Sequence, residues 1–109
     1  MRPPPHPDRV RLLREHEQAA RELRRLMNVG PATAGDLLLL EVRSVADLAA
    51  RDPDELYERL CHIDGYRHDA CVRDVLQAAV EQAQGKPPRP WFEITRERKL
   101  RERRRGRGL

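Results

Sequence analysis

Aromatic residues are scarce in this chain of 109 residues, which contains Tyr57, Tyr66, Trp91 and Phe92 and no others. A core with so few rings has to be built from leucine, valine and alanine, which suits short packed helices better than a sheet. Apolar residues make up 39% of the chain and charged residues 37%, so there is apolar material for one small core. We therefore expect a single all-α domain.

Long apolar runs are also missing. No stretch approaches the roughly 20 apolar residues that a membrane-spanning helix needs. Residues 1–7 are rich in proline and contain no apolar stretch of the kind found in signal peptides. We therefore expect a cytoplasmic protein that does not bind a membrane. In that compartment Cys61 and Cys71 are expected to be reduced thiols rather than a disulfide.

Motifs for catalysis and for metal binding are absent as well. The chain has no P-loop and no nucleophile elbow, so we expect neither enzymatic activity nor a cofactor. Cys61, His62, His68 and Cys71 are of the residue types that bind zinc, but they contain no C-x2-C pair. The adjacent Cys61 and His62 would point about 100° apart on a helix. We therefore expect no metal site.

The net charge of +4 is unevenly distributed along the chain. Residues 1–35 carry seven arginines against four acids, whereas residues 36–81 carry eleven acids against five arginines. Residues 96–109 carry eight basic residues against two acids. A polyanion would therefore meet separate basic patches at the two ends rather than a uniformly basic surface.

Apolar periodicity and capping residues predict five helices within residues 8–85. Asp8, Ser44 and Asp52 have the side chains of helix N-caps, and Asp69 begins the last helix. The predicted helices cover about residues 8–27, 31–40, 44–49, 52–64 and 69–84. Asp64 and Asp69, on either side of a break at Gly65, are expected to be solvated.

The remaining segments are expected to lie outside the helical domain 8–85. Residues 1–7 form a disordered lead, and the proline-rich run 86–90 cannot be helical. In the linker 86–95, Trp91 and Phe92 are expected to dock back onto the helices. Residues 96–109 form a basic tail, either a flexible arm that binds nucleic acid, which we favour, or a solvated helix end.

Residues 26–38 read LMNVGPATAGDLL, which is the pattern of a helix-hairpin-helix motif. In such a motif a tight turn exposes backbone N–H groups at the start of the second helix, where they hold a phosphate oxygen. Gly30, Ala32 and Thr33 are the candidate donors. Glycine is expected at position 30 because a Cβ would obstruct the phosphate and forbid the turn. Val29 is expected to plug the space between the helices, and Ala34 to let them pack closely.

The motif departs from its usual form at two places. Asn28 stands where glycine is common, and asparagine is the next-best residue for a left-handed turn. No basic residue follows Pro31, so we expect nearby arginines to replace it, with the tail adding affinity without specificity. The candidate DNA-binding residues are Arg24, Arg25, Asn28, Val29, Gly30, Pro31, Ala32, Thr33, Arg43, Arg103, Arg104 and Arg105.

A second, degenerate copy of the motif is predicted 37 residues later. Aligning Leu26 with Ile63 places Tyr66 opposite Val29 and Cys71 opposite Ala34. Paired motifs of this kind pack as a pseudo-twofold bundle similar to sterile-alpha-motif (SAM) domains. The second copy lies in an acidic region, and we expect it to be structural.

Several short stretches together resemble one bacterial family. They are Asn28-Val29-Gly30-Pro31, Asp52-Pro53, His68-Asp69-Ala70-Cys71, Pro90-Trp91-Phe92 and Arg96-Glu97-Arg98-Lys99. Across about residues 20–99 the chain is similar to the small helix-hairpin-helix proteins known as pathogenicity locus or mitomycin-resistance-like proteins. The resemblance implies a fold of a DNA-binding type and no particular activity. Glu41 stands where a glycine turn is expected.

Two functions of different classes follow from these patterns. The first is non-sequence-specific binding of duplex DNA by a monomer, in an accessory role in DNA repair, uptake or maintenance, with a possible protein partner. The second is a protein-interaction module in which an acidic helical face is the binding surface and the tail alone binds nucleic acid. That face comprises Asp47, Asp52, Asp54, Glu55 and Glu58.

Overall fold

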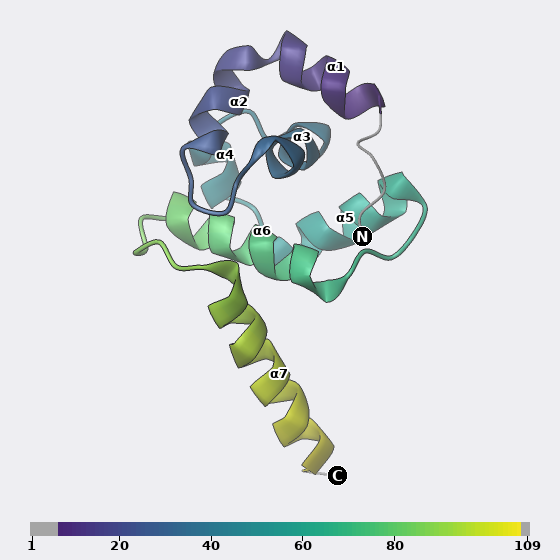
Figure 1. The fold of residues 1–109 in the computed structure, drawn as a ribbon, viewed down its shortest axis with the longest axis vertical. Helices are drawn as coiled ribbons and strands as arrows, with labels where there is room; N and C mark the ends of the chain where they lie inside the picture. Colours follow the sequence, from purple (N-terminus) through teal and green to yellow (C-terminus); the bar gives the residue numbers. More distant parts are fainter. Residues whose placement is uncertain (1–6, 108–109) are drawn as a thin grey trace.

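The computed structural model describes residues 7–107, and all regular structure in that range is helical (Figure 1). The all-α prediction is therefore confirmed, but the number of helices is seven rather than five. No helix in this part of the chain is long and apolar enough to cross a membrane. The helices are α1 (Pro7–Glu15), α2 (Glu17–Arg24), α3 (Pro31–Leu39), α4 (Val45–Ala49), α5 (Pro53–Asp64), α6 (Ala70–Ala83) and α7 (Trp91–Arg107).

One of the two additional helices arises from a break in the first predicted helix. The backbone of His16 (φ −121°, ψ 51°) leaves the helical region and separates α1 from α2. Both helices contact α3, and the bend between them lets each approach α3 from its own direction (Figure 1). Asp8 lies in the first turn of α1 rather than at its cap. Apolar spacing alone did not reveal the break, because the stripe continues on both sides of it.

The helix starts predicted at Ser44, Asp52 and Asp69 are confirmed, whereas the cap predicted at Asp8 is not. Ser44, Asp52 and Asp69 each accept a hydrogen bond from a backbone N–H of the following turn, at 3.0, 2.9 and 2.8 Å. Gly65 ends α5 in the left-handed conformation (φ 75°), which glycine adopts at no steric cost. Glu41 also has a positive φ of 68°, so the turn expected there forms without glycine.

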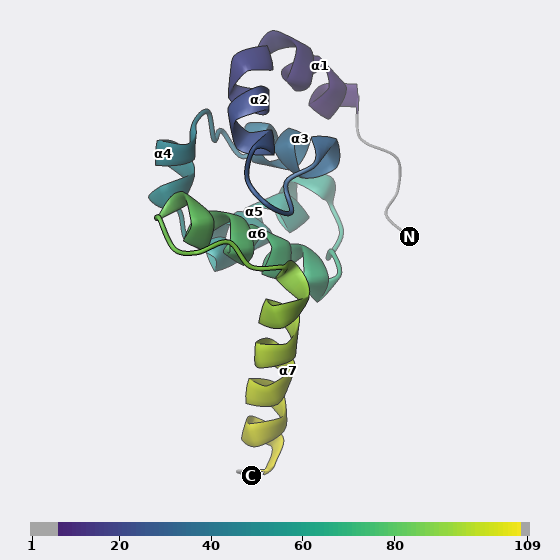
Figure 2. The same cartoon turned by 60° about the vertical axis from the view of Figure 1, so that its left-hand side comes forward.

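Leucine side chains build the core, as the scarcity of aromatic residues predicted. Helix α3 lies at its centre, enclosed by the other helices of the domain (Figures 1 and 2). Leu37 and Leu38 of α3 are completely buried, and Val29 from the preceding turn is 5% exposed. They pack with Leu23, Leu40, Val42, Leu48, Leu56, Leu60 and Leu76.

A buried network of charged residues connects the N-terminal helix to this core. Arg9 of α1 is 5% exposed; its Nε donates to Oδ1 of Asp36 at 2.6 Å, and its Nη2 donates to Oδ2 of Asp64 at 2.7 Å. The same Asp64 oxygen lies 2.6 Å from Nε2 of His68. The expectation that Asp64 is solvated is wrong, because its carboxylate neutralises a buried guanidinium.

Gly35 makes this network possible by allowing α1 to cross α3 closely. A Cβ placed on Gly35 would lie 3.2 Å from Cβ of Arg9, which is tighter than ordinary van der Waals contact. The aliphatic stem of Arg9 therefore rests on the bare backbone of α3, and its head group reaches the two carboxylates.

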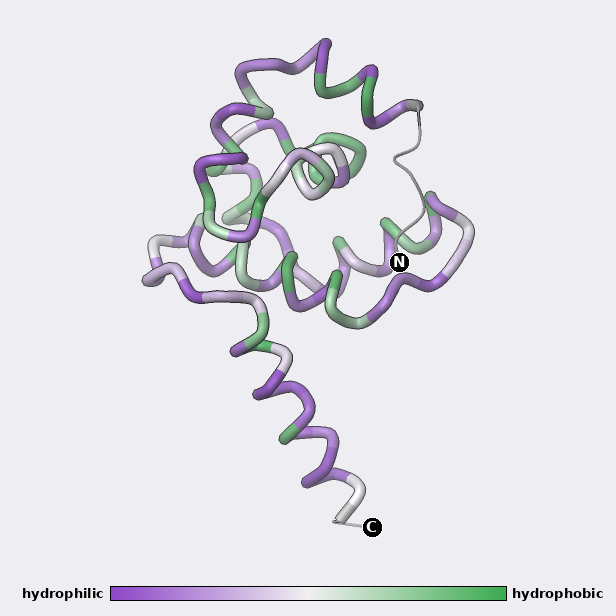
Figure 3. Tube along the Cα trace, viewed as in Figure 1, coloured by the Kyte–Doolittle hydropathy of each residue, from purple (hydrophilic) through white to green (hydrophobic). Residues whose placement is uncertain are grey.

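The basic C-terminal segment is a helix and not a flexible arm. Residues 91–107 form α7, so the boundary expected between residues 95 and 96 falls inside a helix. Figures 1 and 2 show α7 projecting from the body of the protein, and Figure 3 shows that its outer part is mostly hydrophilic. Ile94 anchors α7 to the rest of the protein and is completely buried, whereas Phe92, which was expected to dock, is 52% exposed. Residues 1–6 and 108–109 lie outside the described part of the chain.

Polar contacts with α6 hold α7 in this orientation. Asp74 of α6 is completely buried and accepts from Thr95 Oγ1 at 2.6 Å and from Arg98 Nη2 at 3.1 Å. Arg89 in the linker bridges Glu81 of α6 and Glu97 of α7, at 3.0 and 2.6 Å. The first two turns of α7 are therefore part of the folded body.

Replacement of Arg9 by methionine is expected to lower the free energy of unfolding by about 3–5 kcal/mol, because two carboxylates would remain buried without their cation. The Arg11→Met variant is the matched control, since Arg11 is exposed on the same helix. Urea denaturation of the two variants measures the difference. Equal midpoints would show that the network contributes little to stability.

The stability should also depend on pH through Asp64. Burial alone would raise the pKa of this carboxyl, but the hydrogen bonds from Arg9 and His68 outweigh it and lower the pKa below 3.8. A depressed carboxyl pKa stabilises the fold above the unfolded value and ceases to do so as the pH falls through the folded value. The destabilisation caused by Asp64→Asn, measured in urea, should therefore shrink as the pH falls below about 4. The exposed Glu15→Gln variant should show no such change.

Candidate nucleic-acid interface

The predicted hairpin lies between α2 and α3, and its left-handed residue is Asn28. Asn28 has a φ of 72°, as expected for a residue that replaces glycine. Gly30 is extended (φ −93°, ψ −170°), a conformation open to any residue. The expectation that glycine is required at position 30 for the turn is therefore wrong. A Cβ placed there would meet no atom within 4 Å, so packing does not require glycine either.

Helix α3 begins without a cap. Gly30 occupies the N-cap position and has no side chain that could accept a hydrogen bond. Pro31 has no N–H, and within residues 7–107 the N–H groups of Ala32 and Thr33 have no acceptor. Gly30, Pro31 and Ala32 are exposed, and Thr33 is half-buried. Helices α4, α5 and α6, in contrast, all begin with a serine or aspartate that binds a first-turn N–H.

The turn is held in place by the segment that precedes α7. The side-chain amide of Asn28 donates to the carbonyl oxygen of Arg89 at 3.0 Å, and the backbone N–H of Met27 donates to Gln82 Oε1 at 2.8 Å. The proline-rich linker therefore supports the hairpin on one side and leaves the start of α3 open. No pattern in the sequence indicated this hydrogen bond to the linker, because the two segments are 61 residues apart.

The structure brings some of the predicted arginines to the hairpin and not others. Arg24 and Arg25 are exposed where α2 enters the turn. Arg43 lies at the opposite end of α3, where its Nη1 donates to the carbonyl oxygen of Leu38 at 2.6 Å. It therefore caps the C-terminus of α3 and is not a substitute for the missing basic residue. The arginines at positions 103–105 are exposed on the outer turns of α7.

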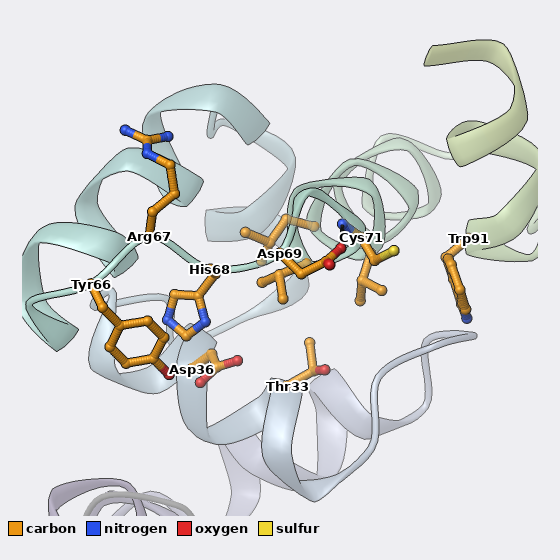
Figure 4. A pocket seen from close by; sticks show the side chains of 11 residues that line it. Thr33, Asp36, Tyr66, Arg67, His68, Asp69, Cys71 and Trp91 are labelled. Carbon is orange, nitrogen blue, oxygen red and sulfur yellow. Dashed lines mark hydrogen bonds between the residues drawn. The ribbon is translucent and has the colours of Figure 1, made fainter. Parts of the chain in front are cut away.

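A groove of about 580 Å³ opens beside the start of α3 (Figure 4). Its walls come from α3, from the loop between α5 and α6, and from the first turns of α6, and Trp91 lies at one end. Thr33 belongs to both features, since its backbone N–H is at the open helix start and its side chain lines the groove. The lining residues are Thr33, Asp36, Tyr66, Arg67, His68, Asp69, Cys71, Val72, Val75, Leu76 and Trp91.

The Cys71 thiol and the Asp69 carboxylate of the groove are engaged in hydrogen bonds. Hydrogen bonds between Cys71 and Asp69 lower the pKa of that carboxyl and raise the pKa of the Cys71 thiol. A raised thiol pKa disfavours the thiolate, which is the nucleophilic form of cysteine. Cys61 is buried, and its Sγ accepts from the backbone N–H of His68 at 3.4 Å. Within the described chain, no three histidine, cysteine, aspartate or glutamate side chains are grouped to hold a metal ion.

The predicted second copy of the motif does not repeat the geometry of the first. Tyr66, which aligns with the buried Val29, is 42% exposed. The buried residue in this loop is His68, held by Asp64. Asp69 caps α6 and so occupies the kind of N–H group that is open in α3. This loop has a structural role in positioning one wall of the groove.

The chain is thus a small all-helical protein. Its helix α3 has glycine at the N-cap position, without a side-chain cap, and begins beside a groove. The chain belongs to the family described as "Pathogenicity locus", whose model matches residues 16–100. It is similar to the mitomycin resistance protein McrB of Streptomyces lavendulae, with 44% identity over 78 residues, 72% of this chain and 74% of the relative. No solved structure matches the chain significantly. The membership of this family that was expected from the short stretches is confirmed, whereas the helix-hairpin-helix type stays a prediction.

Replacement of Gly30 by aspartate should raise the free energy of unfolding by about 0.5 kcal/mol, because aspartate would cap α3 as it caps α5 and α6. Gly65→Ala is the contrasting variant, and should lower stability by about 1–2 kcal/mol because of the positive φ at that position. Thermal and urea unfolding measure both. Destabilisation by Gly30→Asp would mean that the start of α3 is not as open as described.

Proposed function

We propose that this protein binds duplex DNA without sequence specificity, through the N-terminus of α3. The observation that carries this proposal is the missing cap of α3. Position 30 has room for any side chain, yet it is occupied by glycine, which leaves the first N–H groups of α3 without a side-chain acceptor. A cap would stabilise the helix, and its absence leaves backbone donors available to a ligand.

The chemistry of the helix start suits a phosphate. The N–H groups of Gly30, Ala32 and Thr33 have no protein acceptor within the described range, and the positive end of the α3 dipole adds to them. The Thr33 hydroxyl offers one more donor. Contacts of this kind bind the DNA backbone and read no bases, so binding would be independent of sequence.

Basic side chains supply the remaining attraction. Arg24 and Arg25 flank the hairpin. Helix α7 carries eight basic residues and three glutamates, and Glu97 and Glu102 are paired with Arg89 and Arg98. The outer turns of α7 therefore present positive charge that would release counterions from DNA, giving a steep dependence on salt.

The alternative, a protein-interaction module of the SAM-like kind, is favoured less by the structure. Its acidic face is exposed, but nearby arginines already neutralise much of it. Asp54 pairs with Arg73 at 2.7 Å, and Glu58 pairs with Arg67 at 3.1 Å. Glu55 pairs with Arg51 as well. A basic partner would have to displace these contacts, so we place this function second.

An accessory role follows from the limited chemistry of the site. We propose that the protein acts as a monomer in DNA repair, uptake or maintenance, and that a partner protein supplies any catalysis. The name of the Streptomyces relative suggests survival in the presence of mitomycin as a cellular readout of such a role.

Fluorescence anisotropy with a labelled random-sequence duplex, at about 50 and 200 mM salt, tests the proposal. Gly30→Asp should weaken binding at least tenfold although it stabilises the fold, because the new carboxylate occupies the donors and repels phosphate. Gly30→Asn adds a neutral cap and should weaken binding less. Replacement of Arg103, Arg104 and Arg105 by glutamine should reduce the salt slope by about 0.9 for each phosphate that the arginines no longer neutralise.

Substitutions are preferable to truncation at Thr95, which would remove Arg98 from the buried Asp74. If Gly30→Asp bound DNA as tightly as the unchanged chain while the triple variant lost binding, the hairpin would not be the site. The basic helix would then account for all DNA affinity.

A further inference from the structure

We propose that the groove beside α3 receives one unpaired base of a DNA strand whose phosphate is bound at the start of α3. This inference rests on the proposed function and adds a preferred DNA structure to it. The ligand class is a nucleobase with an exocyclic amino group: cytosine, adenine or guanine.

The groove lies next to the proposed phosphate site. Thr33 presents its backbone N–H at the open helix start and its side chain to the groove (Figure 4). A phosphate bound to this N–H would be attached through its sugar to a base near the groove mouth. A base inside an intact duplex stays stacked, whereas an unpaired or extruded base is free to enter a neighbouring pocket.

The shape and surface of the groove fit a flat ring. Val72, Val75 and Leu76 of α6 supply an apolar surface, and the volume of about 580 Å³ is within the range of small-molecule sites. Trp91 is half-buried at one end. Phe92 meets its ring edge-on, at 76°, and no other ring of the described residues contacts it. As part of the groove lining, Trp91 supplies an aromatic ring for stacking on a base.

Charge complementarity selects a base rather than an anionic ligand for the interior. Of the charged groove residues, Asp36 is paired with Arg9 and Arg67 with Glu58, whereas Asp69 is exposed. The Asp69 carboxylate would repel a phosphate but can accept a hydrogen bond from an amino group, as carboxylates do from cytosine N4. Nε2 of His68 faces Asp64 at 2.6 Å. The phosphate is thus directed to the helix start and the amino-bearing edge of the base to the groove.

The test compares four duplexes of one length: fully paired, with a single bulged cytosine, with a bulged thymine, and with a bulged abasic site. The cytosine bulge should bind about tenfold or more tightly than the paired duplex, by anisotropy. The thymine and abasic bulges should show a smaller preference, since thymine lacks the amino group and the abasic site lacks the ring. Trp91 is the single tryptophan of the chain, so its fluorescence should be quenched most by the cytosine bulge.

Three variants assign the preference to the groove. Trp91→Leu should bring the ratio of the bulged to the paired affinity close to one. Trp91→Phe keeps an aromatic face and should retain most of the preference. Val10→Ala changes an exposed apolar residue of α1 outside the groove lining and should leave both affinities unaltered. Thermal unfolding of each variant shows that the fold is retained.

The outcomes separate this inference from the function on which it rests. Binding of the paired duplex with equal affinity for all bulges would overturn the groove assignment alone. Equal preference for cytosine and abasic bulges would also overturn it, because DNA flexibility would then be the cause. Failure of every duplex to bind at low salt would overturn both proposals.

Discussion

The buried guanidinium of Arg9 is the interaction on which the arrangement of this protein depends. It joins α1 to Asp36 of α3 and to Asp64 at the end of α5, and Asp64 in turn holds His68. Taking three charged groups out of water is unfavourable unless they are fully paired, so the network tolerates one geometry of these elements. That geometry sets the separation between α3 and the 66–69 loop, which are two walls of the groove.

A buried carboxylate with an arginine partner also fixes the position of α7 relative to α6. Asp74 receives Thr95 and Arg98 from α7, and Arg89 connects α6 to α7. These hydrogen bonds raise the pKa of Arg89 and Arg98, which remain fully charged. A chain with four aromatic residues has few large side chains for joining helices. Arginine, with a long apolar stem and several donors, replaces them in this fold.

Features with a local signature could be predicted from the sequence, and features made by distant residues could not. The caps at Ser44, Asp52 and Asp69 depend on side chains within three residues of the N–H groups they bind. The partners of Arg9 are 27 and 55 residues away, and no spacing rule indicates them. The basic tail was expected to be a flexible arm, but the anchoring of α7 depends on Asp74, 21 residues before Thr95.

In the candidate site, too, local features could be predicted from the sequence and features made by distant residues could not. The left-handed turn at Asn28 and the buried Val29 follow from the motif itself. The roles of Gly30 and Arg43 could not be predicted. The sequence does not distinguish a glycine needed for backbone geometry from one that leaves a helix without a cap, nor does it show that Arg43 binds the C-terminus of α3. The groove was not predicted at all, since its lining comes from α3, α6, the loop between α5 and α6, and the start of α7.

Helix α7 is held in one orientation by its contacts with α6, and this limits which ligands its basic residues can bind. A disordered tail loses conformational entropy when it binds, but it adapts its course to almost any polyanion. The ordering of α7 is completed during folding, so its positive charges are already aligned along one axis before a ligand arrives. Such a helix favours a partner whose negative charges run in a straight line at a set orientation to the hairpin. A rigid basic helix therefore favours a ligand of matching shape over other polyanions.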